Sequence, residues 1–447
     1  QTVPQGGMGG RRVDIAQGRG LGGGTSINAM MYVRGNPKDF DRWAEMGARG
    51  WAYKDVLPYF MRGENYAGGD DAYRGRSGSL RVIDMAEKSA AATAFIAAAR
   101  DLGHSRFEGD FNGAQHEENA FLYQSTRLTT FERCSSSTAF IDPLRNDPRL
   151  MLLTGAQVSR IVIEDGRAVG VAYVCGGRSE EIRASREVFL TAGAFLSPQL
   201  LLLSGIGPAD HLRAHGINVV SDLPGVGQNL QDHLLLPVCY RASLVLDAPQ
   251  LLSEAGIFLY SGVYDRSTSS PDLQFFFGPI QFADPQYVDD GPGFTLVPIL
   301  AQPRSRGTVR LASADPTQKP VVDPGYLSDP RDVHVLLRGL RIARDLATNK
   351  AFDSMRDKEL APGADAASEE ELVSYIRASA STVWHPVGTC RMGDPGEATT
   401  VLDSSLRVRG VSGLRVADAS AMPMITSGNT NAASIMIGDK AADHILA

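Results

Sequence analysis

Cysteine is scarce in this 447-residue chain, and no CxxC pair occurs among its four copies, Cys134, Cys175, Cys239 and Cys390. That spacing argues against a disulfide framework and a structural zinc site, and it favours a reducing, cytoplasmic setting. No run approaches the roughly 18 apolar residues that a membrane-spanning helix requires. The net charge of −7 argues against nucleic acid and anionic membranes as partners. We therefore expect a globular protein without a transmembrane segment, either a monomer or a homodimer.

Glycine, by contrast, is abundant, with 47 residues and a dense cluster from Gly18 to Gly24. After that cluster, residues 39–62 have a helical pattern of apolar positions. Two β-rich runs flank Asp165-Gly166, a dipeptide that predicts a hairpin turn. A strand over residues 187–191 then leads through Ala192-Gly193 into a helical run. Strand, glycine turn and helix in this order are typical of a nucleotide-binding α/β layer.

The middle of the chain, from about Leu235 to Val322, has the short β-rich runs and Pro/Gly turns of an antiparallel sheet. Helices are predicted over residues 330–349 and from Ser368, where Glu371 completes a capping box. The end returns to strand, loop and helix. We therefore expect a mixed α/β (α+β) fold with a discontinuous cofactor domain and a second domain threaded through it. The expected boundaries are 1–55, 150–235 and 395–447 for the cofactor domain, and 56–149 and 236–394 for the other.

The glycine cluster could be a flexible loop, which is the ordinary reading of an isolated glycine-rich stretch. Glycines also let backbone N–H groups approach a phosphate or a flat ring, because they lack a Cβ atom. Polar side chains follow directly at Thr25, Ser26 and Asn28. The surrounding motifs decide between these interpretations.

Four motifs occur in order along nearly the whole chain: Gly18 to Asn28 continuing to Tyr32, Gly35 and Asp41; Gly193-Ala194 to Gly207; Trp384-His385-Pro386 to Gly393; and Val416 to Ser420 continuing through Gly428-Asn429-Thr430-Asn431 to Lys440. Together they resemble the signatures of the glucose–methanol–choline (GMC) oxidoreductase family, in the branch that is similar to bacterial choline dehydrogenases. The resemblance implies a Rossmann-like FAD-binding domain interleaved with an antiparallel-sheet substrate domain.

One feature of the family is not found near the start of the sequence. Relatives open with a strand, a G-x-G-x-x-G turn and a helix whose N-terminus holds the FAD pyrophosphate. A βαβ unit needs roughly 30 residues or more, and the residues before Gly18 leave no room for one. We therefore expect the chain to lack this N-terminal segment, with impaired FAD binding as an open alternative. Residues 1–10 are polar and show no signal-peptide pattern.

The resemblance also implies the residues that remain to contact the cofactor. Ile27 stands where some relatives carry a histidine covalently joined to the flavin, so we expect non-covalent FAD. An ordinary strand valine is the alternative for Val158, and a turn or cap residue is the alternative for Asp418. The implied contacts are Gly22, Gly23, Gly24, Thr25, Asn28, Ala29, Val158, Asp418, Ala419, Thr430 and Asn431.

His385 is the expected catalytic base among eight histidines, because imidazole has a pKa near neutral and the neighbours Trp384 and Pro386 are apolar. The family's partner for this base is a histidine or an asparagine, and the matching residue is Asn429. Its amide would donate a hydrogen bond to the developing alkoxide. His233, in another family motif, is interpreted as structural, and no metal is expected.

The implied reaction is FAD-dependent oxidation of a primary alcohol to an aldehyde, with a proton passing to His385, a hydride passing to flavin N5, and O₂ or a quinone as the electron acceptor. Alternatives are a non-redox member of the hydroxynitrile lyase or photodecarboxylase type, and a truncated chain that binds FAD poorly. Strand alternation places Phe276 on the face opposite Phe275 and Phe277. The resemblance implies that this strand borders the substrate cavity, so Gln274, Phe276 and Trp384 are expected to line an aromatic pocket that favours an apolar alcohol; plain sheet core is the alternative for Gln274 and Phe276.

Overall fold

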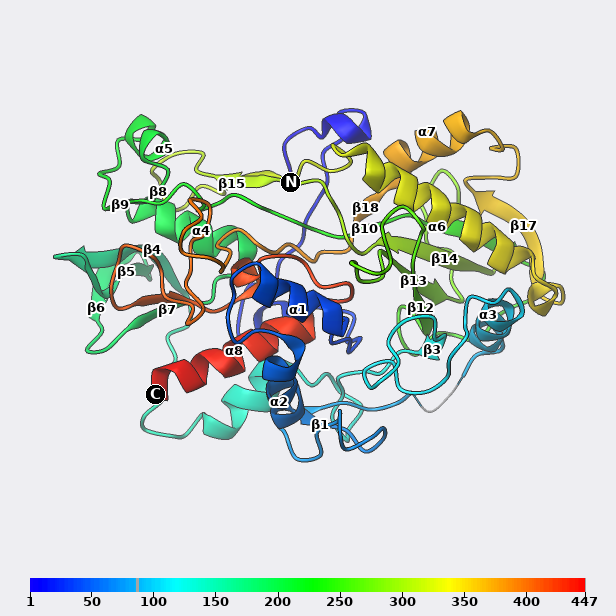
Figure 1. Cartoon of the computed structure of the whole chain (residues 1–447), viewed down its shortest axis with the longest axis horizontal. Helices are drawn as coiled ribbons and strands as arrows, with labels where there is room; N and C mark the ends of the chain where they lie inside the picture. Colours follow the sequence, from blue (N-terminus) through cyan, green and yellow to red (C-terminus); the bar gives the residue numbers. More distant parts are fainter. Residues whose placement is uncertain (86–87, 447) are drawn as a thin grey trace.

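The computed structural model describes residues 1–85 and 88–446, and its largest element is an eight-stranded sheet (Figure 1). The main path through this sheet is β17-β11-β14-β13-β12-β3. The short strand β10 also pairs with β14, and β18 pairs with β10. The pairing among β10 to β14 is antiparallel, as the sequence predicts. The strands are β3 (Phe121–Leu122), β10 (Leu234–Leu235), β11 (Val238–Ala242), β12 (Ala255–Leu259), β13 (Leu273–Gly278), β14 (Gly293–Leu300), β17 (Arg356–Ala361) and β18 (Ser381–Thr382).

The two faces of this sheet bury different side chains. Phe275 and Phe277 of β13 belong to a core shared with the helices α3 (Ala90–Asp101), α6 (Pro330–Thr348) and α7 (Glu369–Ser379). Phe276 points the other way, into a smaller and strongly aromatic cluster. The period of two that defines a strand explains this split, and it confirms the predicted alternation. The capping box between Ser368 and Glu371 at the start of α7 is also present.

A second region combines a parallel strand pair with helices (Figure 1). β7 (Val188–Leu190) pairs in parallel with β19 (Leu414–Val416). β7 leads into α4 (Gly193–Leu203), and the loop after β19 leads into α8 (Asn431–Leu446). Because both loops follow carboxyl ends of parallel strands, they meet at one edge of the pair, which is the usual ligand-binding edge of an α/β sheet.

The predicted hairpin at Asp165-Gly166 is present, and both residues have positive φ, 47° and 72°. It joins β4 (Ala156–Glu164) to β5 (Arg167–Cys175), which pairs in turn with β6 (Arg178–Arg183). The remaining short elements are α5 (Ala209–Ala214), β1 (Glu64–Asn65), β2 (Leu80–Arg81), β8 (Ile206–Gly207), β9 (Ser221–Asp222), β15 (Thr308–Arg310) and β16 (Val321–Asp323).

The helix predicted over residues 39–62 is wrong as a single element. The structure has two helices there, α1 (Pro37–Glu45) and α2 (Tyr53–Gly63). Gly47 and Gly50 lie between them with φ values of 90° and 79°, a conformation that ends a right-handed helix. Within the described residues, no helix is both long and apolar enough to cross a membrane.

A buried histidine in the core provides a stability prediction. The His116 ring stacks on Phe258 with centroids 4.1 Å apart, and its Nε2 has no hydrogen-bond partner. Burial lowers the pKa of His116 to about 3, so below pH 6.5 the unfolded chain binds a proton that the folded chain excludes. Stability therefore falls as the pH falls. The free energy of unfolding, measured with urea, should fall between about pH 6.5 and about pH 5 by roughly 2 kcal/mol more in the wild type than in His116→Phe. Equal losses in both proteins would contradict this assignment.

Candidate active site

The candidate catalytic residues meet at one end of the eight-stranded sheet. Leu234 of β10 pairs with Leu300 of β14 on one side and with Thr382 of β18 on the other. This register brings together the residues just outside those strands: His233, Ala301 and the segment that leads to His385. Gln274 of β13 pairs with Ile299 at the same end. Residues separated by more than 150 positions in the sequence thus become neighbours.

Two histidine rings contact each other at this point. Nδ1 of His385 lies 3.0 Å from Nδ1 of His233, and Nε2 of His233 lies 3.0 Å from the carbonyl oxygen of Ala301. A carbonyl only accepts hydrogen bonds, so Nε2 of His233 carries its proton and donates it. Nδ1 of a neutral His233 is then an acceptor, and the donor must be the Nδ1–H of His385. The proton of His385 is therefore on Nδ1, and its Nε2 presents a lone pair.

The environment keeps both rings neutral. Burial lowers the pKa of His385 well below 6.5, and the neighbouring His233 lowers it further. Burial also lowers the pKa of His233 to about 4. Nε2 of His385 makes no hydrogen bond to any residue that the structure describes. A neutral imidazole with a free Nε2 lone pair is the form that a general base requires.

A buried carboxylate fixes the backbone that carries His385. Oδ1 of Asp232 accepts from the backbone N–H of His385 at 2.8 Å. Its Oδ2 accepts from the hydroxyls of Tyr326 at 2.5 Å and Thr382 at 2.6 Å. Burial raises the pKa of Asp232 to about 6, and these hydrogen bonds oppose the increase by stabilising the charged form. Sequence reasoning did not single out Asp232, although it lies in the same motif as His233.

Asn429 reaches the same area from the loop before α8. Its Oδ1 accepts a hydrogen bond from Nε2 of Gln274 at 3.0 Å, and no described residue accepts from its Nδ2. The loop is anchored by Asp39, whose Oδ2 accepts from the backbone N–H and the hydroxyl of Ser427, at 2.7 and 2.8 Å. Thr426 of this loop also places its backbone against His233. The described contacts thus tie Asn429 to the His385 end of the sheet, with an amide N–H free to donate.

The glycine loop forms a compact turn around its own hydroxyls. Thr25 Oγ1 donates to the carbonyl of Gly22 at 2.5 Å, and it accepts from the backbone N–H of Ser136 at 2.9 Å. A Cβ on Gly22 would come within 2.3 Å of Ser26 Oγ, so the turn requires glycine there. A Cβ on Gly23 or Gly24 would meet open space, so their backbone is accessible.

Two residues predicted to contact FAD, Asp418 and Asn28, hydrogen-bond to other residues of the protein. Asp418 caps a short turn after β19 by accepting from Ser420, and it also accepts from the backbone N–H of Gly193 at 2.9 Å and from Ser197 Oγ at 2.5 Å. It thus joins the carboxyl end of β19 to the start of α4. Asn28 Oδ1 accepts from Arg133 at 2.6 Å. The other residues predicted to contact FAD are Ala29 against the aromatic cluster, Val158 in β4, Ala419 after Asp418, and Thr430 and Asn431 at the start of α8; their contacts with the cofactor stay a prediction.

An aromatic cluster lies beside Gln274 and Asn429; its rings are Phe111, Phe121, Tyr123, Phe258 and Phe276. The Tyr123 and Phe276 rings meet edge to face with centroids 5.6 Å apart. Burial raises the pKa of the Tyr123 hydroxyl, and no charged side chain contributes to that shift. Trp384, predicted to wall the pocket, is 45% exposed and has a positive φ of 59°.

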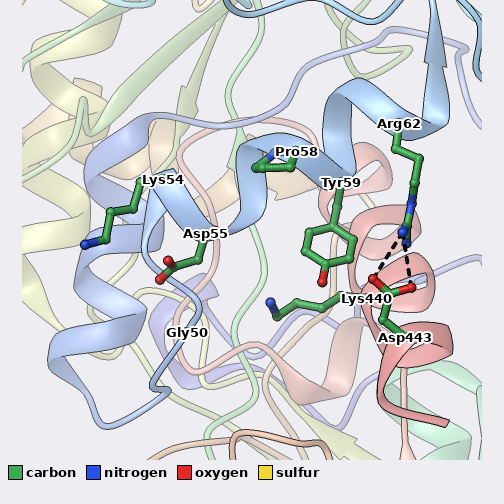
Figure 2. A pocket seen from close by; sticks show the side chains of 8 residues that line it. All are labelled: Gly50, Lys54, Asp55, Pro58, Tyr59, Arg62, Lys440 and Asp443. Atoms are coloured by element: carbon green, nitrogen blue, oxygen red, sulfur yellow. Dashed lines mark hydrogen bonds and ion pairs between the residues drawn. The ribbon is translucent and has the colours of Figure 1, made fainter. Parts of the chain in front are cut away.

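A separate hollow of about 460 Å³ lies between α2 and α8 (Figure 2). Two of its three cations, Arg62 and Lys440, are already engaged. Arg62 pairs with Asp439 at 2.8 Å and Asp443 at 3.1 Å, and Nζ of Lys440 lies 4.6 Å from the ring centre of Tyr59. These contacts fasten α8 to α2. The hollow therefore supports the helix that begins at Asn431, and we do not assign it a ligand.

Comparison with known proteins gives a consistent result. Two family profiles described as GMC oxidoreductase match residues 5–235 and 303–438. An oxygen-dependent choline dehydrogenase of Sinorhizobium medicae (strain WSM419) is 41% identical over 467 aligned positions, which span 100% of this chain and 84% of the relative. The corresponding protein of Rhizobium meliloti (strain 1021) is 40% identical with the same coverage.

Two solved structures superpose closely on the chain. Pyridoxine 4-oxidase from Mesorbium loti has a TM-score of 0.92 and 32% identity, over 99% of this chain and 87% of that one. An FAD-dependent oxidoreductase from Chaetomium thermophilum has a TM-score of 0.89 and 25% identity, over 99% and 88% of the two chains. The mixed α/β fold predicted from the motifs is therefore confirmed.

Proposed function

The chain belongs to the GMC oxidoreductase family, and we propose that it acts on a CH–OH donor, as the similar choline dehydrogenases do, and oxidises a primary alcohol to the aldehyde with FAD as cofactor. The observation that carries the proposal is that the free Nε2 lone pair of His385 and the free amide N–H of Asn429 occur at the same end of the sheet. A base and a hydrogen-bond donor are what an alcohol hydroxyl needs in order to lose its proton.

The chemical step follows from these two groups. Nε2 of His385 removes the hydroxyl proton, and the resulting imidazolium keeps its Nδ1–H bond to His233. Nδ2 of Asn429 donates to the oxygen, which carries negative charge as the proton leaves. FAD held at this site would supply the acceptor for the hydride from the carbinol carbon, so that the alcohol loses two electrons and two hydrogens. The product is the aldehyde, and we propose O₂ or a quinone as the final electron acceptor.

The glycine loop and the start of α8 are the groups that would hold FAD. A Cβ at Gly23 or Gly24 would meet open space, so the backbone at these two glycines suits close approach of a flat or phosphorylated group. Ile27 is 58% exposed on the same loop, and an isoleucine has no atom that could bond covalently to a flavin. The positive end of the α8 dipole, at Asn431, would favour negative charge on the cofactor. We therefore propose non-covalent binding.

The aromatic cluster supports an apolar substrate. A choline-type cation could bind to aromatic faces, but burying a cation also favours a nearby carboxylate, and the described hydrogen bonds of the Tyr123, Gln274 and Asn429 side chains involve no carboxylate. The similar pyridoxine 4-oxidase is named for an aromatic alcohol, which agrees with rings lining the site. We propose that an aromatic or aliphatic primary alcohol is preferred over a sugar or a quaternary amine.

A substrate panel tests this preference. Turnover should be compared for benzyl alcohol, a medium-chain alkanol, choline and glucose under identical conditions. Benzyl alcohol should exceed choline in kcat/KM by at least about 10-fold, since fitting an apolar group to such a site contributes roughly 1–3 kcal/mol. A clear preference for choline or glucose would contradict the proposed substrate class, and the assignment of His385 would be unaffected.

A further inference from the structure

The side-chain amide of Gln274 is fully buried, and its nitrogen has hydrogen-bond partners while its oxygen has none. Its Nε2 donates one hydrogen to the hydroxyl of Tyr123 at 2.9 Å and the other to Oδ1 of Asn429 at 3.0 Å. Its Oε1 is buried and has no hydrogen-bond partner. A buried acceptor without a donor costs about 1–3 kcal/mol, so this carbonyl calls for an explanation.

The orientation of the amide is set by its neighbours. The hydroxyl of Tyr123 donates to the backbone carbonyl of Phe275 at 3.2 Å. With its only hydrogen used there, that hydroxyl must accept from Gln274, so the nitrogen of the amide faces Tyr123. Asn429 then receives the second N–H on its Oδ1, which leaves its own Nδ2 free to donate to the reacting oxygen. One chain of hydrogen bonds thus fixes both amides, beginning at the Phe275 carbonyl.

The position of Oε1 follows from this chain. It shares a carbon with the Nε2 that touches Asn429, so it lies close to the place where the alkoxide would be held. Gln274 and Phe276 project from the same face of β13, toward the aromatic cluster. The cluster consists of apolar and aromatic side chains, and the Tyr123 hydroxyl is already committed to Phe275. Among the described residues, no donor serves Oε1, so a ligand is the natural source.

We propose that Gln274 determines substrate specificity, with Oε1 accepting a hydrogen bond from a second donor, a hydroxyl or an N–H, that the alcohol carries next to its carbinol group. This rests on the proposed function, because it assumes that Asn429 holds the reacting oxygen. The preferred substrate is then an aromatic primary alcohol with a neighbouring hydrogen-bond donor. An alcohol without that donor leaves Oε1 unpaired in the complex, which lowers affinity.

Three alcohols that differ only at the ortho position test the proposal: 2-hydroxybenzyl alcohol, 2-methoxybenzyl alcohol and unsubstituted benzyl alcohol. Rapid mixing under anaerobic conditions gives a dissociation constant and a limiting rate of flavin reduction for each. We expect the 2-hydroxy compound to bind about 10-fold more tightly than the other two, the effect of one hydrogen bond to a buried acceptor. The limiting rates should differ much less, since the hydrogen bond from the ortho hydroxyl stabilises the bound alcohol and the transition state equally.

The variant Gln274→Met removes the acceptor and keeps a side chain of similar length. It should abolish the difference in dissociation constant among the three alcohols, and it should also slow all of them because Asn429 loses its orienting bond. Phe276→Leu is the matched control: it alters the same face of β13 but leaves Oε1 in place, so the preference for the 2-hydroxy compound should persist.

The outcomes separate this inference from the function on which it rests. If benzyl alcohol reduces the flavin but the wild type binds all three alcohols equally, the specificity role of Gln274 is wrong and the proposed function stands. If Gln274→Met keeps the preference, another group supplies the acceptor and the inference is again wrong. If none of the alcohols reduces the flavin, both fall together. The wild-type comparison alone decides the matter should Gln274→Met fail to fold.

Discussion

The variant His385→Ala should reduce its flavin with alcohol about 1,000-fold more slowly than the wild type, within the range of roughly 10²–10⁴ for loss of a general base. Without Nε2, the site loses the basic nitrogen that takes the hydroxyl proton, and the unpaired amide oxygen of Gln274 is too weak a base to replace it. The measurement is the limiting rate of flavin reduction in anaerobic stopped flow. Flavin content should be determined for both proteins, so that the rate refers to loaded enzyme.

A surface histidine offers the matched control. His334 lies exposed on α6, so His334→Ala should leave the rate of flavin reduction unchanged. The pH dependence adds a second test. Because burial lowers the pKa of His385 well below 6.5, the wild-type rate should stay nearly constant from about pH 8 down to about pH 6.5 and fall only in more acidic solution. A rate in His385→Ala equal to that of the wild type would refute the role of this residue.

The second large effect is expected at His233, which acts on the reaction through His385. In His233→Leu the Nδ1–H of His385 loses its acceptor, so the ring is no longer held in the tautomer that leaves Nε2 unprotonated. We expect the limiting rate of flavin reduction to fall about 100-fold, at the upper end of the effect of losing a supporting hydrogen bond behind a functional imidazole. The same rapid-mixing experiment measures it.

Rescue distinguishes positioning from mere packing. In His233→Gln the amide oxygen is able to accept from His385 and the amide nitrogen is able to donate to the Ala301 carbonyl, so both bonds are kept. This variant should recover most of the rate that His233→Leu loses. His233 contributes to the lowered pKa of His385, so in His233→Leu that pKa should rise and the fall in rate at acidic pH should begin at a higher pH. If the Leu and Gln variants are equally slow and their pH profiles match the wild type, His233 is only a packing residue.

Features that lie within one segment of the chain could be predicted from the sequence. The motif around His385 and the loop with Asn429 led to the GMC family, and the comparisons confirm that membership. The period of two along β13 correctly separated Phe276 from Phe275 and Phe277. The break between α1 and α2 was missed because the apolar pattern continues through it, while the two glycines with positive φ mark it only in the structure.

What sequence could not supply were contacts between distant segments. His233 and His385 are 152 positions apart, and nothing in either motif indicates that their rings touch. The interpretation of His233 as structural therefore missed its contact with the base. Gln274 and Asn429 are 155 positions apart, and only the pairing of β13 with β14 and the loop before α8 bring their amides together. The donor and acceptor roles along such a chain of hydrogen bonds depend on the carbonyl at its start, and only the structure shows which carbonyl that is.

A visible spectrum recorded before and after anaerobic addition of benzyl alcohol tests the central claim most directly. We expect the absorption bands of an oxidised flavin in the purified protein, and their loss when the alcohol is added without light or any other reductant. Bands that persist with benzyl alcohol and with every other alcohol would contradict alcohol oxidation and favour a non-redox member of the family. A protein that shows no flavin bands, even after incubation with FAD, would contradict the account from its first step.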